Sequence, residues 1–313
     1  MRYRPLGRTG LEVSAIALGT VELGLAYGVG AQGTTSPPSE EEASRLLHHA
    51  ADAGITLFDT APTYGESERL LGRALGKRRD CLFATKISLP PAFAAEAAPG
   101  VLRRAIEASL QASRRALQRD VLDLVQLHNA TEAAITRGAV AEVLLEARRR
   151  GEVRFLGVTV YGERAALAAL SAGYVDVIQV AYSLLDQRMA ARVLPQAAAA
   201  GVGVLGRSAL LKGALTPRAQ WLPPELTPLR EAARQVCRAY DISWAQLPRL
   251  ALRFCLAAPQ LSAVLVGART IEELDQALAA AAAGPLSAAE VSLAQDLGLS
   301  DERLVNPTFW PVP

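Results

Sequence analysis

The sequence has few cysteines, and they carry no recognisable spacing. Only Cys81, Cys237 and Cys255 occur in 313 residues, far apart and odd in number. This pattern excludes a disulfide framework, lacks the spacing of a metal site, and favours free thiols in a reducing, cytoplasmic compartment. We therefore expect no metal centre.

Long apolar runs and one-sided charge are also missing. No segment approaches the about 18 uncharged apolar residues of a membrane helix, and the first residues, MRYRPLGRTG, lack the apolar stretch of a secretory signal. Lysine and arginine number 33 against 31 acidic residues, a formal net charge of +2, without a long run of one sign. The sequence therefore indicates neither membrane nor nucleic-acid binding.

What the sequence does contain is an alternation of short β-rich runs and helical segments. Helical periodicity marks residues 40–53, 66–75 and 137–150, each followed by glycine. Eight strand–helix units over roughly 250 residues predict one (β/α)8 barrel domain spanning residues 1–313. The expected strands are Ala15–Gly19, Thr56–Phe58, Leu82–Thr85, Leu122–Gln126, Phe155–Val158, Val177–Val180, Gly203–Gly206 and Ala263–Val266. A doubly wound sheet is less favoured, because the glycines at 28, 30 and 33 open no helix.

Segments outside this repeat are expected at the two ends of the barrel. Tyr3–Leu6 and Leu11–Val13 flank a glycine-bounded turn, which predicts a β-hairpin covering the bottom. The tail Asn306–Pro313 is expected to fold over the opposite, functional face. Long loops at that face, after the carboxyl ends of strands, are predicted for Val21–Pro38, Ile87–Gly100 and Leu211–Pro224.

Four side chains of complementary chemistry follow three of these strands. Asp59, Tyr64, Lys86 and His128 would face a common mouth, because the carboxyl ends of barrel strands point there. Lys86, paired with Asp59, would lower the phenol pKa of Tyr64 from about 10. Tyr64 could then exchange a proton with a carbonyl oxygen, while a neutral His128 adds a hydrogen bond.

These residues and their spacing resemble the aldo-keto reductase superfamily. The resemblance runs from PLGRTGLEVSAIALGT (5–20) through FDTAPTYGESERLLGRAL (58–75), ATK (84–86) and LHN (127–129) to the last helices. It implies that Asp59, Tyr64, Lys86 and His128 are the catalytic set, with Tyr64 as general acid/base. The implied reaction is reversible hydride transfer between a nicotinamide cofactor and a small-molecule carbonyl or alcohol, sugars included.

The cofactor positions follow the family less closely. A Ser-Asn pair usual in the family is replaced by Thr159-Val160, whereas Gln179 matches. An aromatic residue that stacks on the nicotinamide is replaced by Arg207. The cofactor-binding residues implied by the resemblance are Gly19, Thr20, Asp59, Thr159, Gln179, Arg207, Ser208, Leu210, Lys212, Gly213, Gly267, Arg269 and Glu273.

The segment Val266–Leu278 resembles the part of the family that grips the adenosine 2′-phosphate. Arg269 favours a phosphate, whereas Glu272 and Glu273 suit a free ribose hydroxyl, and Ala277 replaces a usual asparagine. The resemblance favours NADP(H), with NAD(H) as the alternative.

Two other functions are compatible with parts of the sequence. One is a non-catalytic, cofactor-holding regulatory subunit of the same fold, although the complete four-residue set favours an enzyme. The other is a Schiff-base lyase that uses Lys86 as nucleophile. Such a lysine needs a depressed pKa, which a neighbouring Asp59 would oppose.

Overall fold

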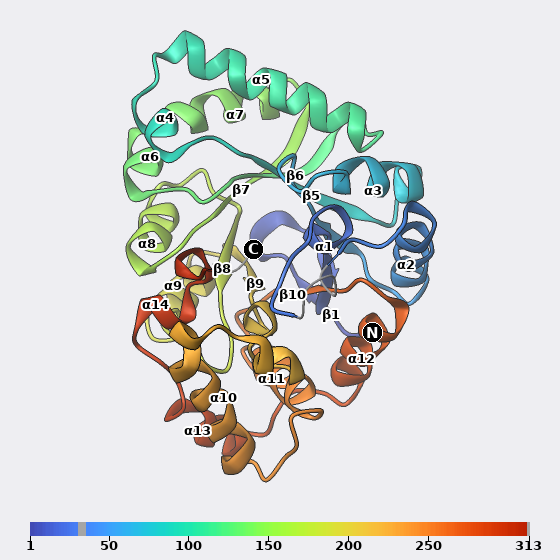
Figure 1. Cartoon of the computed structure of the whole chain (residues 1–313). Coiled ribbons are helices and arrows are strands. Elements are labelled where there is room, and N and C mark those ends of the chain that lie inside the picture. Colours follow the sequence, from blue (N-terminus) through green and yellow to red (C-terminus); the bar gives the residue numbers. More distant parts are fainter. Residues whose placement is uncertain (31–35, 312–313) are drawn as a thin grey trace.

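Eight short apolar segments form parallel strands that close into a barrel (Figure 1). The computed structural model describes residues 1–30 and 36–311. Around the barrel the strands are β3 (Ile16–Gly19), β4 (Leu57–Asp59), β5 (Leu82–Ile87), β6 (Leu122–Leu127), β7 (Val153–Thr159), β8 (Val177–Ala181), β9 (Gly203–Arg207) and β10 (Ala263–Gly267), which pairs back with β3. Most of their side chains are buried, as expected for parallel strands covered on both faces. The predicted (β/α)8 fold is confirmed.

Amphipathic helices surround the strands and bury their apolar faces against them (Figure 1). Helix α2 begins at a capping box in which Ser39 and Glu42 satisfy each other's backbone N–H groups. The helices are α1 (Val21–Gly24), α2 (Glu40–Asp52), α3 (Ser67–Leu75), α4 (Pro91–Glu96), α5 (Pro99–Ala116), α6 (Glu132–Arg137), α7 (Ala139–Arg149), α8 (Glu163–Ser171), α9 (Val193–Ala199), α10 (Thr227–Ala239), α11 (Leu247–Leu256), α12 (Ile271–Ala282), α13 (Ala288–Gln295) and α14 (Glu302–Val305).

The helix predicted over residues 137–150 is present as α7 (Ala139–Arg149), but it begins two residues later than expected. Gly138 has a φ of +73°, which ends α6 and starts α7 at the same residue. Only glycine takes this left-handed conformation without steric cost, so the helix breaks there.

The expected long loops at the functional face contain local structure of their own. Helix α1 lies in the first and α4 in the second, whereas short 3-10 helices, Leu211–Gly213 and Pro217–Trp221, lie in the third. Residues 31–35 of the first loop, including Gly33, and residues 312–313 of the tail lie outside the described residues.

The predicted amino-terminal hairpin is present and covers the bottom of the barrel. Strands β1 (Tyr3–Pro5) and β2 (Glu12–Ser14) pair antiparallel, joined by a 3-10 turn at Gly7–Thr9. Leu6 and Val13 are buried in one cluster with inward-facing strand residues such as Leu57. The hairpin therefore closes the end of the barrel opposite the strand carboxyl ends.

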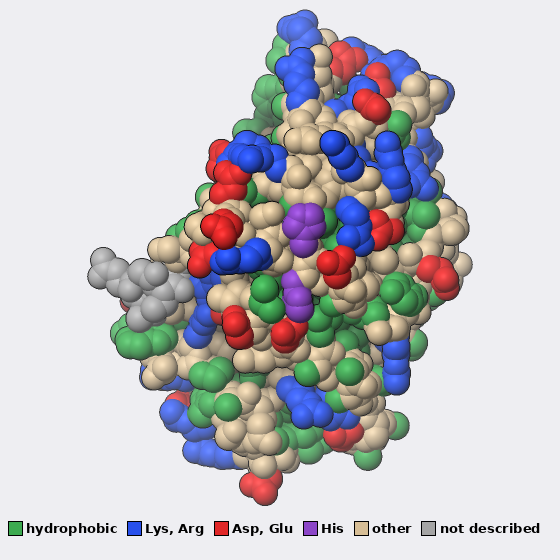
Figure 2. All heavy atoms as spheres, turned by 90° about the vertical axis from the view of Figure 1, so that its right-hand side faces the viewer, with side chains coloured by type: hydrophobic (Ala, Val, Ile, Leu, Met, Phe, Trp, Pro, Cys, Tyr) green, Lys and Arg blue, Asp and Glu red, His purple; other side chains and the backbone are tan. Residues whose placement is uncertain are grey.

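Charge on the outer surface is mixed in sign. Figure 2 shows acidic and basic side chains interspersed over one face of the molecule. Many of these groups are paired, as in the bridges from Arg69 to Glu40 at 3.0 Å and from Arg78 to Asp52 at 2.8 Å. In the described part of the chain, no helix is long and apolar enough to cross a membrane.

Candidate active site

The centre of the candidate site is an ion pair inside the barrel mouth. The Nζ atom of Lys86, on β5, lies 2.5 Å from Oδ1 of Asp59, the last residue of β4. The same ammonium group donates to the carbonyl of Thr60 at 2.8 Å. Lys86 is fully buried, which by itself disfavours its charge, but Asp59 and Tyr64 raise its pKa. Lys86 is therefore a cation, which contradicts the requirement of a Schiff-base nucleophile.

The second oxygen of Asp59 is held by two glutamines from β6 and β8, across the barrel mouth. Gln126 on β6 and Gln179 on β8 donate to Oδ2 from 3.1 and 2.9 Å. Together with Lys86, these donors satisfy both carboxylate oxygens and fix the side chain in place. Gln126 was not among the predicted site residues; it lies two residues before His128 and so faces the same side of β6.

Tyr64 is placed by a tight turn between β4 and α3. Its N–H donates to the carbonyl of Ala61 at 3.0 Å, and its own carbonyl accepts from Ser67 at 3.1 Å. Gly24 packs against this turn so closely that a Cβ there would lie 1.9 Å from the Tyr64 carbonyl oxygen. Because residue 24 of α1 is a glycine, the backbone of residues 64 and 65 can pack directly against that helix.

The phenol of Tyr64 lies against both the cation and the imidazole. Lys86 Nζ is 4.7 Å from its ring centroid, and the His128 ring packs edge-on at 5.9 Å. Burial raises the pKa of Tyr64, while Lys86 and Arg207 act to lower it. The expected lowering by Lys86 is present, but burial outweighs it, and Tyr64 is a protonated phenol at neutral pH.

His128 is a neutral hydrogen-bonding group. Burial, together with the charges of Lys86 and Arg207, lowers its pKa to about 3. Its Nδ1 lies 2.9 Å from the hydroxyl of Ser88, which leaves Nε2 as the nitrogen available to the mouth. Ser88 was also missed by sequence reasoning; it lies two residues beyond Lys86, directly after the last residue of β5.

These groups border one cavity of about 780 Å³ at the carboxyl ends of the strands. Asp59, Tyr64 and His128 line it, whereas Lys86 lies behind Asp59 and does not. Arg269 is also absent from the lining and is largely buried. The other predicted cofactor residues line the cavity: Gly19, Thr20, Thr159, Gln179, Arg207, Ser208, Leu210, Lys212, Gly213, Gly267 and Glu273.

The end of the cavity near Tyr64 carries the polar groups that a carboxamide needs. The Thr159 hydroxyl accepts from the N–H of Asn129 at 2.7 Å, so its own proton is free to point elsewhere. Gln179 uses its amide nitrogen on Asp59, which leaves its carbonyl oxygen as an acceptor. This donor and acceptor set fits a nicotinamide carboxamide without the asparagine that Val160 replaces.

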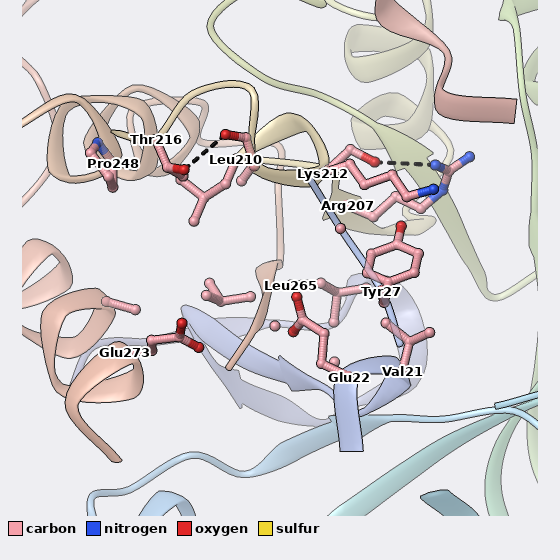
Figure 3. A pocket seen from close by; sticks show the side chains of 18 of the residues that line it. Val21, Glu22, Tyr27, Arg207, Leu210, Lys212, Thr216, Pro248, Leu265 and Glu273 are labelled. Atoms are coloured by element: carbon pink, nitrogen blue, oxygen red, sulfur yellow. Dashed lines mark hydrogen bonds between the residues drawn. The ribbon is translucent and has the colours of Figure 1, made fainter. Parts of the chain in front are cut away.

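Arg207, at the end of β9, does not stand alone over the cavity. Its guanidinium carbon lies 4.0 Å from the ring centroid of Tyr161, and it donates to the carbonyl of Val160 at 3.2 Å. Figure 3 shows Arg207 and Tyr27 side by side at one end of the cavity. Tyr27 and Tyr161, neither predicted, give this end a polar and aromatic character.

At the opposite end of the cavity two arginines surround one carboxylate, and of these three residues Arg218 and Glu273 line the cavity. Glu273, in the first turn of α12, pairs with Arg218 from the third long loop and with Arg269, whose Nη2 lies 3.4 Å away. The backbone N–H of Arg269 also donates to Glu273 at 2.9 Å. Arg218 was missed because no local pattern links residue 218 to residue 273.

Ala277 lines the cavity, whereas the two aromatic residues of the tail do not. Phe309 is exposed, and Trp310 is buried within the tail. The Trp310 indole instead donates to the carbonyl of Arg303 at 3.2 Å. Within residues 1–30 and 36–311, no three His, Cys, Asp or Glu side chains gather as metal ligands would.

Comparison with known families gives one consistent result. The model of the Aldo/keto reductase family matches residues 15–298. The chain is 30% identical to L-galactose dehydrogenase from Arabidopsis thaliana, over 97% of this chain and 92% of that protein. It is 28% identical to pyridoxal 4-dehydrogenase from Microbacterium luteolum, over 87% and 91% of the two chains.

Solved structures agree with the sequence comparison. The holo form of the aldo-keto reductase AKR11C1 from Bacillus halodurans superposes with a TM-score of 0.78 and 27% identity, covering 96% of this chain and 97% of that one. Its apo form gives a TM-score of 0.74.

Proposed function

Because the chain belongs to the Aldo/keto reductase family, and is thus an oxidoreductase of carbonyl compounds that uses a nicotinamide cofactor, we propose that Tyr64 is its general acid/base. The observation that carries this proposal is the position of the Tyr64 phenol between the Lys86–Asp59 pair and a neutral His128, at the edge of one cavity.

The four side chains divide the work of proton transfer. In the reducing direction, Tyr64 donates its proton to the substrate oxygen as negative charge develops there. Lys86 stabilises the resulting phenolate, and Asp59 holds Lys86 charged and in place. His128, neutral throughout, donates a directional hydrogen bond to the same oxygen. When bound, the nicotinamide supplies or accepts the hydride.

The cofactor is proposed to be NADP(H), with NAD(H) as the alternative. Thr159 and Gln179 would hold the carboxamide, and the loop from Ser208 to Gly213 would lie along the phosphates. Arg218 and Arg269 carry two positive charges against the single charge of Glu273. The excess positive charge at this end of the cavity favours a 2′-phosphate.

The substrate is proposed to be a small, hydroxyl-bearing carbonyl or alcohol. Arg207, Tyr27 and Tyr161 offer polar groups close to Tyr64 and His128, which suits a hydroxylated molecule better than a purely apolar one. L-galactose and pyridoxal, the compounds in the names of two relatives, are the natural first substrates to assay. The three buried free thiols support a cytoplasmic location.

Substitution of Tyr64 tests the catalytic proposal. In Tyr64→Phe, we expect turnover to fall by about 10²- to 10⁴-fold, because the proton donor is lost. Dissociation constants for NADPH and NADH, measured by fluorescence titration, should stay within about twofold. Tyr174→Phe removes a phenol that does not line the cavity and should behave as the parent protein.

Each outcome of this experiment has a defined meaning. Full turnover in Tyr64→Phe would refute its role as acid/base. Cofactor binding without turnover on a broad panel of carbonyls and alcohols would favour the non-catalytic regulatory subunit. Failure to bind either dinucleotide would overturn the oxidoreductase mechanism proposed here.

A further inference from the structure

Glu22 occupies an unusual position on the floor of the cavity. It lies in α1, directly after β3, and its carboxyl group reaches over the end of β10. A Cβ on Gly267 would lie 1.7 Å from its Oε2, so only the bare glycine backbone leaves room for the carboxyl group. Among the described residues, the buried Oε2 atom has no hydrogen-bond partner.

The surroundings of Glu22 disfavour a negative charge. Burial, followed by repulsion from Glu273, raises the pKa of Glu22 to about 7, against the opposing attraction of Arg218. Arg218 is already paired with Glu273, as is Arg269. Figure 3 shows the Glu22 side chain between Tyr27 on one side and Glu273 on the other.

Glu22 also lies between the two functional ends of the cavity. Asp59 and Tyr64 border the end of the cavity next to β4, and Glu273, on α12, borders the other end. Glu22 follows β3, and β3 lies between β4 and β10 in the barrel. A dinucleotide that spans both ends brings its two anionic phosphates past this carboxyl group. An ionised Glu22 would repel them, whereas a protonated Glu22 can donate a hydrogen bond.

We propose that Glu22 accepts the dinucleotide only in its protonated, neutral form, so that cofactor binding takes up a proton at every pH at which Glu22 is ionised in the free protein. This inference rests on the proposed function, because it concerns the same cofactor. Since the bound phosphates favour the neutral acid further, the proton affinity of Glu22 is higher in the complex than in the free protein. Cofactor affinity is then constant on the acidic side of the Glu22 titration and falls by about tenfold per pH unit on the alkaline side.

Other ionisable groups near Glu22 also bear on the pH dependence of anion binding. Arg218 and Arg269 stay charged, and burial raises the pKa of Tyr27. Burial lowers the pKa of Lys212, which lies over the Tyr27 ring, so loss of its charge would also weaken anion binding as the pH rises. The variant Glu22→Gln separates the two effects, because it keeps Lys212. Glu273 is engaged by both arginines.

The test measures binding, not activity. Dissociation constants of NADH and NADPH are measured by fluorescence between pH 6.5 and 8.5, above the titration of the 2′-phosphate near ~6. Calorimetry in two buffers of different ionisation enthalpy gives the protons taken up. We expect the affinity of the parent protein for the dinucleotide that binds to fall at least about tenfold over this range, with uptake of up to one proton.

Glu22→Gln keeps the size of the side chain and removes its charge. In this variant any fall in affinity over the same range should be only that due to Lys212, and the affinity at pH 8.5 should exceed that of the parent protein by about tenfold or more. Glu142→Gln, an exposed position on α7 far from the cavity lining, should retain the dependence of the parent protein.

The outcomes separate this inference from the proposed function. Binding that is flat with pH in the parent protein, or equally steep in Glu22→Gln, overturns the role of Glu22 and leaves the oxidoreductase proposal standing. Absence of binding for both dinucleotides at every pH overturns both proposals.

Discussion

At position 128, the surroundings decide which chemical form of the side chain exists. An exposed histidine would titrate near ~6.5. Burial and the nearby charges of Lys86 and Arg207 instead lower the pKa of His128 to about 3, so the ring is a neutral donor at any physiological pH. The sequence predicted a neutral His128 by its role; the physical cause is visible only when the two cations are placed beside it.

This depressed pKa predicts a measurable loss of stability in acid. Between about pH 6.5 and pH 3, His128 is protonated in the unfolded chain but not in the folded protein. The free energy of unfolding therefore falls as the pH is lowered. From pH 7 to pH 5 we expect a loss of about 1–2 kcal/mol from this residue. Urea titrations of the parent protein and of His128→Asn at both pH values measure the contribution of His128 to this loss. If the free energy of unfolding falls equally in the two proteins, the prediction is contradicted.

At the scale of elements, the first turn of α12 shows how one residue can have two roles. Thr270 caps this helix by accepting from the N–H of Glu273 at 3.2 Å, which is a local and readable signal. Glu273 also pairs with Arg218, 55 residues earlier, on a loop that the barrel brings across the cavity. The local role was readable from sequence, and the second was not.

The arginine pair predicts how cofactor preference responds to substitution. Glu273→Gln frees both guanidinium groups, so we expect affinity for NADPH to rise relative to NADH by about tenfold. Glu272→Gln is the matched control, because Glu272 is exposed in the same helical turn and contacts neither arginine. An unchanged ratio in Glu273→Gln, or an equal change in both variants, would show that the 2′ position is read elsewhere.

On the scale of the whole molecule, stability and function occupy opposite ends of the barrel. The hairpin β1–β2 closes the bottom of the barrel. There the Arg4 side chain donates to the carbonyl of Leu256 at 2.5 Å, and the backbone N–H of Arg8 donates to the carbonyl of Gly201 at 2.6 Å. Leu6 fills this end of the barrel and packs against Gly203. A Cβ added at Gly203 would lie 3.0 Å from the Cδ1 atom of Leu6. All proposed catalytic groups lie at the other end.

This separation predicts that the core of the hairpin can be damaged without altering the chemistry. Leu6→Ala should lower the free energy of unfolding by about 2–5 kcal/mol, because it leaves a cavity beneath the strands. The ratio kcat/KM should change by less than about twofold at a temperature where the variant remains folded. Leu11→Ala, at a half-buried site, should cost less. A large fall in kcat/KM would contradict the separation.

The sequence by itself determined the fold, the strand positions and the four residues proposed for proton transfer. These follow from local signals: apolar runs of strand length, capping and glycine stops, and polar residues at strand ends. Local signals also explain why the helix predicted for residues 137–150 begins only at Ala139, directly after a glycine in the left-handed conformation.

Only the tertiary structure decided which charges meet. The partners of Asp59 on β6 and β8, the pairing of Arg218 with Glu273, and the carboxyl group of Glu22 over Gly267 all join residues far apart in the chain. Their protonation states depend on burial and on distances across the barrel mouth, which closure of the sheet fixes. No periodicity within a single segment carries that information.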